Sequence, residues 1–246
     1  MSAATYARYE VLRTFRNRRF FIMSLIFPLV LFYLVAGSQR DMVNFAGTGL
    51  SFRVYYMAGM VSWGTMAAVI AGGARIAAER SIGWNRQLRL TPLAPRTYFA
   101  AKVFSGYLMA VVSIVLLYGA GLTLGVNLSA GAWLRMTGLI LVGLVPFAAL
   151  GVLIGHLLTG DSLGPALGGI TSLAALLGGA WGPIFGNSGF LNQVVQLVPS
   201  YWLVQAGQSA ITTNAWPAKA WIVVAVWTVV LTRLAMTAYR RDTARA

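Results

Sequence analysis

The segment from Glu79 to Arg96 holds the residues whose types and spacing best fit a task beyond crossing a membrane. It begins with an acid–base pair, Glu79 and Arg80, continues through Gly83, and ends at Pro92, which stops a helix. Its apolar side consists of Ile82, Leu88, Leu90 and Leu93. A short amphipathic helix of this kind suits docking into a groove on a cytoplasmic partner, although an ordinary solvated basic loop has a similar composition.

Side chains for catalysis or metal binding are scarce. The 246 residues include no cysteine, one histidine and five acidic residues. Disulfides and thiolate chemistry are therefore excluded, and a metal site or a membrane enzyme is a weak hypothesis. A phosphate-binding loop needs Gly-x-x-x-x-Gly-Lys-Ser/Thr, and neither Lys102 nor Lys219 follows such a run. We therefore predict that the chain is not itself an ATPase.

Two ionisable side chains fall near the ends of apolar runs. His156 could form a proton relay with Asp161, five residues further on, but a hydrogen bond at the helix end is the favoured interpretation. Arg75 is expected to extend to the membrane edge or to pair with Glu79 one turn along the helix.

The composition places these residues in a lipid bilayer. Hydrophobic residues make up 58% of the chain and charged residues only 10%, whereas a soluble domain carries about 25% charge. Too little polar surface remains to solvate a globule of this size. We predict an all-α integral membrane protein forming a single transmembrane domain over 1–246, with no cleavable signal peptide.

Six transmembrane helices are expected, because a span needs roughly 20 apolar residues. They fall near 20–37, 55–77, 98–125, 132–158, 162–181 and 216–238. Pro28 is expected to kink the first of them. Residues 4–19 predict an interfacial helix, with Leu12 and Phe15 on its apolar face and four basic residues, Arg13, Arg16, Arg18 and Arg19.

Two connections differ from simple turns. Residues 78–97 form the only substantial connection on the predicted inner side. Residues 182–215 are apolar but interrupted by Pro183, Gly186, Gly189 and Pro199. We interpret this outer segment as a re-entrant pair of short helices, since such backbone is tolerated at membrane depth only against protein or a wet cavity.

The charge distribution predicts an orientation. Fifteen of the nineteen lysines and arginines fall on one side if the N-terminus is inside. Both termini of this multi-pass protein should then be cytoplasmic, in the inner or plasma membrane. The same distribution explains the net charge of +14 through contact with anionic lipid, so no nucleic-acid partner is expected.

Glycines recur at four-residue spacing, which lets helices approach closely in lipid. The pairs are Gly121/Gly125, Gly151/Gly155, Gly164/Gly168 and Gly178/Gly182. Packing within the chain is the favoured interpretation, and a subunit interface is the alternative.

Beyond these local features, the chain resembles the ABC type-2 transporter permeases, the membrane subunits of bacterial ATP-driven exporters. Residues 79–93 resemble the family signature Glu-Arg-x-x-Gly-x-x-x-x-Leu-x-x-Thr-Pro-Leu. The pattern Tyr9, Glu10, Asn17, Arg18, Phe20 and the element Pro199-Ser200-Tyr201 are also typical of the family. The resemblance thus extends over nearly the whole chain.

The resemblance implies partners and roles for particular residues. A second permease subunit, identical or different, would pair with this one above a dimer of ABC ATPase subunits. ATP and magnesium would bind there, and this chain would hold no cofactor. Residues 78–97 would form the coupling helix that receives the motion of the ATPase, through Glu79, Arg80, Gly83, Trp84, Gln87, Leu88, Pro92 and Leu93. The N-terminal helix would join the same cytoplasmic collar, while Pro183, Gly186, Pro199 and Tyr201 would mark the re-entrant segment.

The apolar, aromatic spans favour export of a lipophilic or amphiphilic molecule such as a drug, antibiotic or lipid, which would connect the chain to multidrug resistance. Lipid-linked polysaccharide is the alternative within the same family. An ATP-independent carrier or channel is a further alternative, which would require charge inside the membrane.

Overall fold

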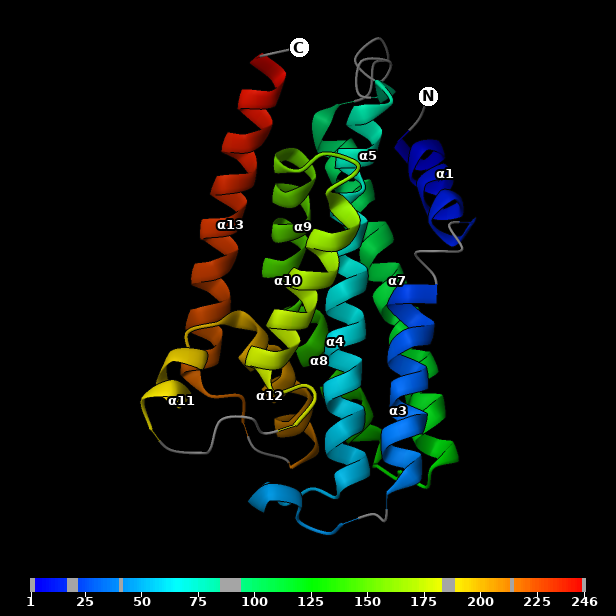
Figure 1. Cartoon of the computed structure of the whole chain (residues 1–246), viewed down its shortest axis with the longest axis vertical. Helices are drawn as coiled ribbons and strands as arrows, with labels where there is room; N and C mark the ends of the chain where they lie inside the picture. Colours follow the sequence, from blue (N-terminus) through cyan, green and yellow to red (C-terminus); the bar gives the residue numbers. More distant parts are fainter. Residues whose placement is uncertain are drawn as a thin grey trace.

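The computed structural model describes residues 3–16, 22–39, 42–84, 94–182, 189–212 and 215–244. Within these residues the regular secondary structure is entirely helical, as predicted (Figure 1). Seven helices in this described part of the chain run along the long axis of the molecule: α3 (Phe27–Ser38), α4 (Phe52–Ala74), α7 (Pro95–Thr123), α8 (Ala130–Gly143), α9 (Val145–Leu157), α10 (Leu163–Gly178) and α13 (Ala218–Ala244). The remaining elements are α1 (Ala3–Arg16), η1 (Ile22–Ile26), η2 (Phe45–Gly47), α5 (Ile76–Ser81), α11 (Phe190–Val195) and α12 (Pro199–Ile211).

Four helical stretches are long and apolar enough to cross a membrane. They are Phe52–Ser81, Arg96–Thr123, Ala130–Leu157 and Ala218–Asp242. The predicted first and fifth spans correspond to shorter apolar helices, Ser24–Ser38 and Leu163–Gly178. At 1.5 Å per residue such helices reach only about 25 Å, short of the roughly 30 Å hydrocarbon core. A multi-helix membrane protein is therefore confirmed, while the number of six complete spans stays a prediction.

Pro28 lies where the first apolar helix changes its geometry. A π-helical turn, η1, precedes α3, and Pro28 stands in the first turn of α3. A proline inside a helix lacks an N–H donor and clashes with the carbonyl four residues earlier, which a wider turn relieves. The irregularity expected at this proline thus takes the form of a π-helical turn.

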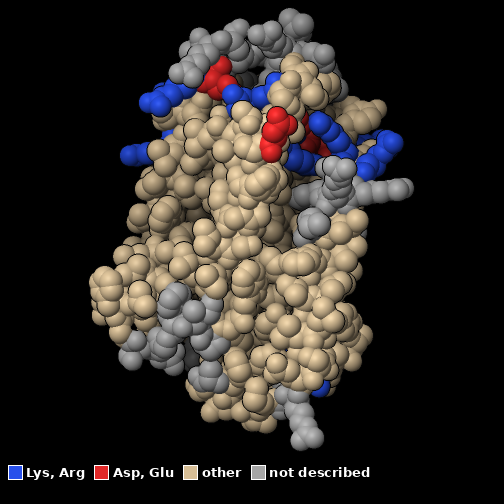
Figure 2. Space-filling model, viewed as in Figure 1, with Lys and Arg blue, Asp and Glu red and all other residues tan. Residues whose placement is uncertain are grey.

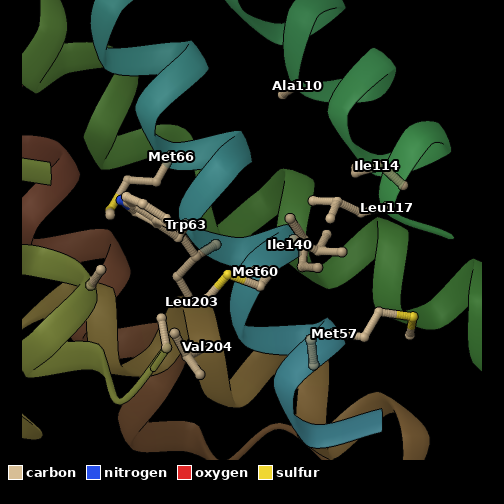
Figure 3. Packing of buried hydrophobic residues seen from close by; sticks show 14 of the residues in the cluster. Met57, Met60, Trp63, Met66, Ala110, Ile114, Leu117, Ile140, Leu203 and Val204 are labelled. Carbon is tan, nitrogen blue, oxygen red and sulfur yellow. The ribbon is translucent and has the colours of Figure 1, made fainter. Parts of the chain in front are cut away.

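Helix α4 forms the centre of the bundle. It has no polar face, and 94% of the most apolar part of the continuous helical stretch Phe52–Ser81, which comprises α4 and α5, is buried. Figure 3 shows Met57, Met60 and Met66 of α4 among side chains of the surrounding helices α7, α8 and α12. A helix without a polar face is stable only when other helices enclose it, which fits this central position.

The two ends of the molecule differ in charge. The N-terminus, the C-terminus and α5 lie at one end, while η2, α11 and α12 lie at the other (Figure 1). Most lysines and arginines visible on the face drawn in Figure 2 gather at the end that carries both termini. The separation of basic residues expected from the sequence is thus present in the fold.

Candidate functional site

The residues predicted to couple the chain to a partner begin on a helix rather than in a loop. Glu79 and Arg80 lie on α5, which continues α4 almost without interruption. Gly83 and Trp84 follow this helix, and α7 begins at Pro95. The connection between helices is therefore 82–94, shorter than the predicted 78–97. Four predicted residues lie outside the described part of the chain: Gln87, Leu88, Pro92 and Leu93.

Gly83 has a backbone conformation that suits glycine. Its φ is +71°, in the left-handed region, and its N–H donates to the carbonyl of Arg80 over 3.1 Å. A Cβ at this position would meet no atom within 4 Å, so the constraint comes from the backbone alone. Gly83 thus ends α5 with a turn of the backbone.

Glu79 is the centre of a buried cluster of charges. Its side chain is only 1% exposed, and its Oε2 accepts a 2.7 Å hydrogen bond from the Tyr98 hydroxyl. Its Oε1 accepts from Arg13 Nη1 at 2.7 Å and also from Lys102 Nζ. The carboxylate therefore joins α5 to α1 and α7.

Lys102 and Glu10 extend this cluster. The Lys102 side chain is fully buried, and its Nζ also donates to Glu10 Oε1 at 2.7 Å. Arg75 Nη2 lies 3.1 Å from the same Glu10 oxygen, 2.7 Å from Thr14 Oγ1 and 3.2 Å from Ser105 Oγ. Arg75 thus forms its ion pair with Glu10 of α1, so the predicted local pairing with Glu79 is wrong. The buried cations Lys102 and Arg75 thus balance the two carboxylates, which buried charges require, while the third cation, Arg13, has a side chain that is half exposed.

The cluster explains how the N-terminal helix sits on the bundle. Its polar residues Glu10 and Thr14 are buried against α4 and α7, whereas Leu12 and Phe15 of the predicted apolar face are exposed, as is Arg16. Arg13 reaches from the rim to Glu79, and Arg18 and Arg19 lie outside the described residues. An arrangement with polar residues inside and apolar residues outside is unfavourable in water but suits a helix whose outer face meets lipid.

Tyr6 lies next to this cluster on α1. It is buried and packs against Tyr98, with ring centroids 6.1 Å apart. Burial, and secondarily the nearby carboxylates of Glu10 and Glu79, raise the pKa of the Tyr6 hydroxyl well above its usual range. Tyr6 therefore stays neutral and adds no charge to the cluster.

Arg80 forms a second cluster on the opposite side of α5. Its Nη1 donates to the carbonyl of His156 at 2.8 Å and to that of Gly155 at 3.3 Å, while its Nη2 donates to Asp242 Oδ1 at 2.7 Å. The two carbonyls belong to the last turn of α9, where a cation is favourable because these groups lack helical partners. Arg80 thus links α5 to both α9 and α13.

His156 has a partner that the sequence did not indicate. Its Nδ1 lies 3.1 Å from Asp242 Oδ2, and its ring packs edge-on against Phe99 and Tyr239. Asp161, the partner considered for a relay, is exposed near the start of α10. The histidine does form a hydrogen bond near the helix end, but with a residue 86 positions away in sequence.

The predicted re-entrant segment contains two helices, α11 and α12. Pro199 occupies the first turn of α12 and Tyr201 is half-buried, whereas Pro183 and Gly186 lie outside the described residues. Two indole N–H groups donate hydrogen bonds to the backbone of this segment. Trp202 Nε1 donates to the Gln196 carbonyl at 2.7 Å, and Trp227 Nε1 of α13 donates to the Leu197 carbonyl at 2.8 Å. The depth of these helices in a membrane stays a prediction.

Among the described residues, no three histidine or carboxylate side chains come close enough to share a metal ion. The charged groups of both clusters are instead bonded to one another across helices. The arrangement can hold α1, α5, α7, α9 and α13 in register beside the 82–94 connection.

Comparison with known proteins relates this arrangement to a family. Residues 38–237 match the family model described as ABC-2 family transporter protein. The chain is also 31% identical over 195 residues to a protein of Bacillus subtilis (strain 168), described provisionally as the transport permease YvfS; the alignment covers 78% of each chain. Glu79, Arg80 and Lys102 lie inside the stretch that the family model matches, whereas Glu10 and Asp242 lie outside it.

Proposed function

Since this chain belongs to the ABC-2 family of transporter proteins, we propose that it is the permease subunit of an exporter driven by a separate ABC ATPase. The observation that carries the coupling part of this proposal is the position of Glu79 and Arg80. Adjacent in sequence, they are bonded to opposite sides of the bundle, directly before the 82–94 connection. A force applied to that connection would reach α1 and α7 through Glu79, and α9 and α13 through Arg80.

The same end of the molecule is proposed to face the cytoplasm. Both termini lie there together with most of the basic residues (Figures 1 and 2). Because cytoplasmic segments of membrane proteins carry the excess of lysine and arginine, this end would meet the ATPase dimer and the anionic inner leaflet. A second permease subunit, identical or different, would complete the transporter.

The substrate is proposed to be lipophilic or amphiphilic, such as a drug, an antibiotic or a lipid. Support comes from the apolar spans and from the exposed aromatic and aliphatic side chains on several helices, including Phe104, Trp221 and Leu173. Lipid-linked polysaccharide is the second candidate.

The buried charges support an ATP-independent carrier less than they support an ATP-driven permease. Lys102, Glu79 and Arg75 do lie within helices long enough to span a membrane, more charge than the sequence suggested. Each of these groups is bonded to oppositely charged partners, which favours a fixed structural role. Transport without ATP that is abolished by His156→Ala would instead favour the carrier.

Substitutions in the 82–94 connection should uncouple the chain from its ATPase. Gly83→Pro fixes φ near −65° where +71° is needed and removes the N–H bonded to Arg80, and Leu88→Glu places a charge on the predicted docking face. We expect both variants to lose ATPase stimulation in the reconstituted complex, measured as phosphate release, and to co-purify poorly with the ATPase. Full assembly and stimulation in both variants would contradict the coupling role.

A milder pair of variants separates coupling from backbone strain. Gly83 and Gly125 both have positive φ, +71° and +83°, and a Cβ would meet no atom within 4 Å at either. Alanine should therefore strain each site by a similar ~1–2 kcal/mol. Only Gly83→Ala should lower ATPase stimulation, because Gly125 lies in the turn between α7 and α8 at the opposite end.

A further inference from the structure

Asp242 near the end of α13 is bonded through both carboxylate oxygens. Oδ1 accepts from Arg80 of α5 at 2.7 Å, and Oδ2 lies 3.1 Å from His156 Nδ1 of α9. The side chain of Asp242 is only 24% exposed and that of Arg80 only 29%. Charge-assisted bonds of this length in a partly dry site are stronger than exposed surface pairs.

Of the four long apolar helical stretches in the described residues, the one in α13 is the least enclosed. Only 28% of its most apolar stretch is buried, compared with 94% for the stretch that contains α4. Near Asp242, the packing of Tyr239 against Phe99 and His156 adds to the bonds of the Asp242 carboxylate. Along its length α13 packs on α9, and it has no extensive packing against α5, so the Asp242–Arg80 pair is the contact that joins α13 directly to α5 in the described part of the chain.

We infer that Asp242 is a positioning residue for coupling: it fastens the end of α13 to Arg80, so that movement of the 82–94 connection turns α5 and α13 together. This inference rests on the proposed function. Asp242 lies beyond residue 237, where the family match ends, so membership of the family does not assign it this role.

The hydrogen bonds of Arg80 explain why a single carboxylate, that of Asp242, is sufficient to join α5 to α13. Its Nη1 is already held by the terminal carbonyls of α9, which orients the guanidinium plane. Nη2 is then directed at Asp242, and no other acidic side chain is within ion-pair distance of Arg80 among the described residues. Asp242→Asn keeps the shape of the side chain but removes the charge, so the end of α13 should lose its direct bond to α5 while both helices stay packed on α9.

The absence of cysteine permits a direct measurement. Cysteines introduced at Ser81 on α5 and Met236 on α13, both exposed, can carry the only two spin labels in the full-length chain. We expect a single narrow distance distribution by pulsed electron resonance in lipid vesicles of phosphatidylethanolamine and phosphatidylglycerol. Asp242→Asn and Arg80→Gln should each broaden it, and the double variant should broaden it no further.

Arg241→Gln is the matched control, because it changes one charge on the neighbouring, exposed residue of the same helix. It should leave the distribution narrow. A narrow distribution in Asp242→Asn, or equal broadening in Arg241→Gln, would overturn the inference.

A second experiment measures stimulation of ATP hydrolysis in the complex of the full chain with its ATPase. Asp242→Asn should assemble normally yet stimulate ATP hydrolysis about fivefold less or worse, the scale of a typical coupling between sites. Asp242→Glu should recover much of the stimulation, and Arg241→Gln should behave as wild type. Undiminished stimulation in Asp242→Asn would overturn the coupling role. Failure of the wild-type chain to bind any ATPase would refute the proposed function instead, while the distance measurement would still decide the link.

Discussion

Glu79→Gln is expected to destabilise the folded chain by about 3–5 kcal/mol, the range for breaking a buried ion pair. The substitution preserves the shape of the side chain but leaves Lys102, Arg75 and Arg13 facing only one carboxylate, that of Glu10. Lys102 is fully buried, so water cannot compensate for the lost partner. The amide oxygen could still accept two of the three hydrogen bonds that reach Glu79, but without the negative charge that offsets the buried cation.

Unfolding in mixed detergent micelles, followed by helical circular dichroism, would measure this loss. Asp161→Asn is the matched control, because it also removes one acidic charge but at an exposed position, and it should shift stability by less than about 0.5 kcal/mol. Equal losses in the two variants would show that net charge, rather than the buried cluster, determines stability.

A second substitution should partly reverse the first. Lys102→Met in the Glu79→Gln background removes the buried cation whose partner has been lost, so Glu10 and Arg75 remain as a matched pair. We expect the double variant to be more stable than Glu79→Gln alone, since replacing buried ion pairs with apolar groups of similar volume is often neutral. Simple addition of the two losses would mean that Glu79 and Lys102 do not act on each other.

The sequence identified the elements of this cluster better than its contacts. Apolar runs of about 20 residues and the Glu-Arg-x-x-Gly pattern predicted the helices and the importance of Glu79 and Arg80. Their partners could not be predicted, because Arg13, Lys102 and Asp242 are separated from them by 66, 23 and 162 residues. Such distances are bridged only by the order in which helices pack, which apolar periodicity does not encode.

Arg75 and Lys102 show why local rules failed here. Pairing of Arg75 with Glu79 follows from helical spacing, but Glu10 on another helix competes for the same guanidinium and prevails. Lys102 is one of the fifteen basic residues that the charge distribution predicts on the inner side. Its complete burial depends on two carboxylates from different helices, α1 and α5, neither of which is within one turn of it in sequence.

The glycine pairs differ in whether another helix packs directly against them. Gly151 and Gly155 pack within the chain, against α4, as favoured from their spacing. A Cβ on Gly164 or Gly168 would meet no atom within 4 Å, so these two leave the alternative of a subunit interface open. The four-residue spacing is the same in both pairs, and only the fold distinguishes them.

Gly151→Ala is expected to be the most damaging exchange of a glycine for alanine on α9. A Cβ there would lie 2.4 Å from the carbonyl oxygen of Ile70 and 3.0 Å from its carbonyl carbon, both in the backbone of α4. Backbone atoms cannot rotate away as a side chain can, so the two helices would have to separate. Overpacking of this kind typically costs about 1–3 kcal/mol, and Gly151→Val should cost more.

Gly138→Ala on α8 provides the comparison, because its Cβ would meet no atom within 4 Å and its helical geometry suits alanine. This variant should be neutral or gain up to ~1 kcal/mol through the lower entropy of the unfolded chain. Thermal unfolding of both variants in the same detergent would test the contrast. Similar stability of the two would mean that α4 and α9 can move apart at little cost. The packing of α4 on α9 would then not be rigid. It could not make α5, which continues α4, move together with α9.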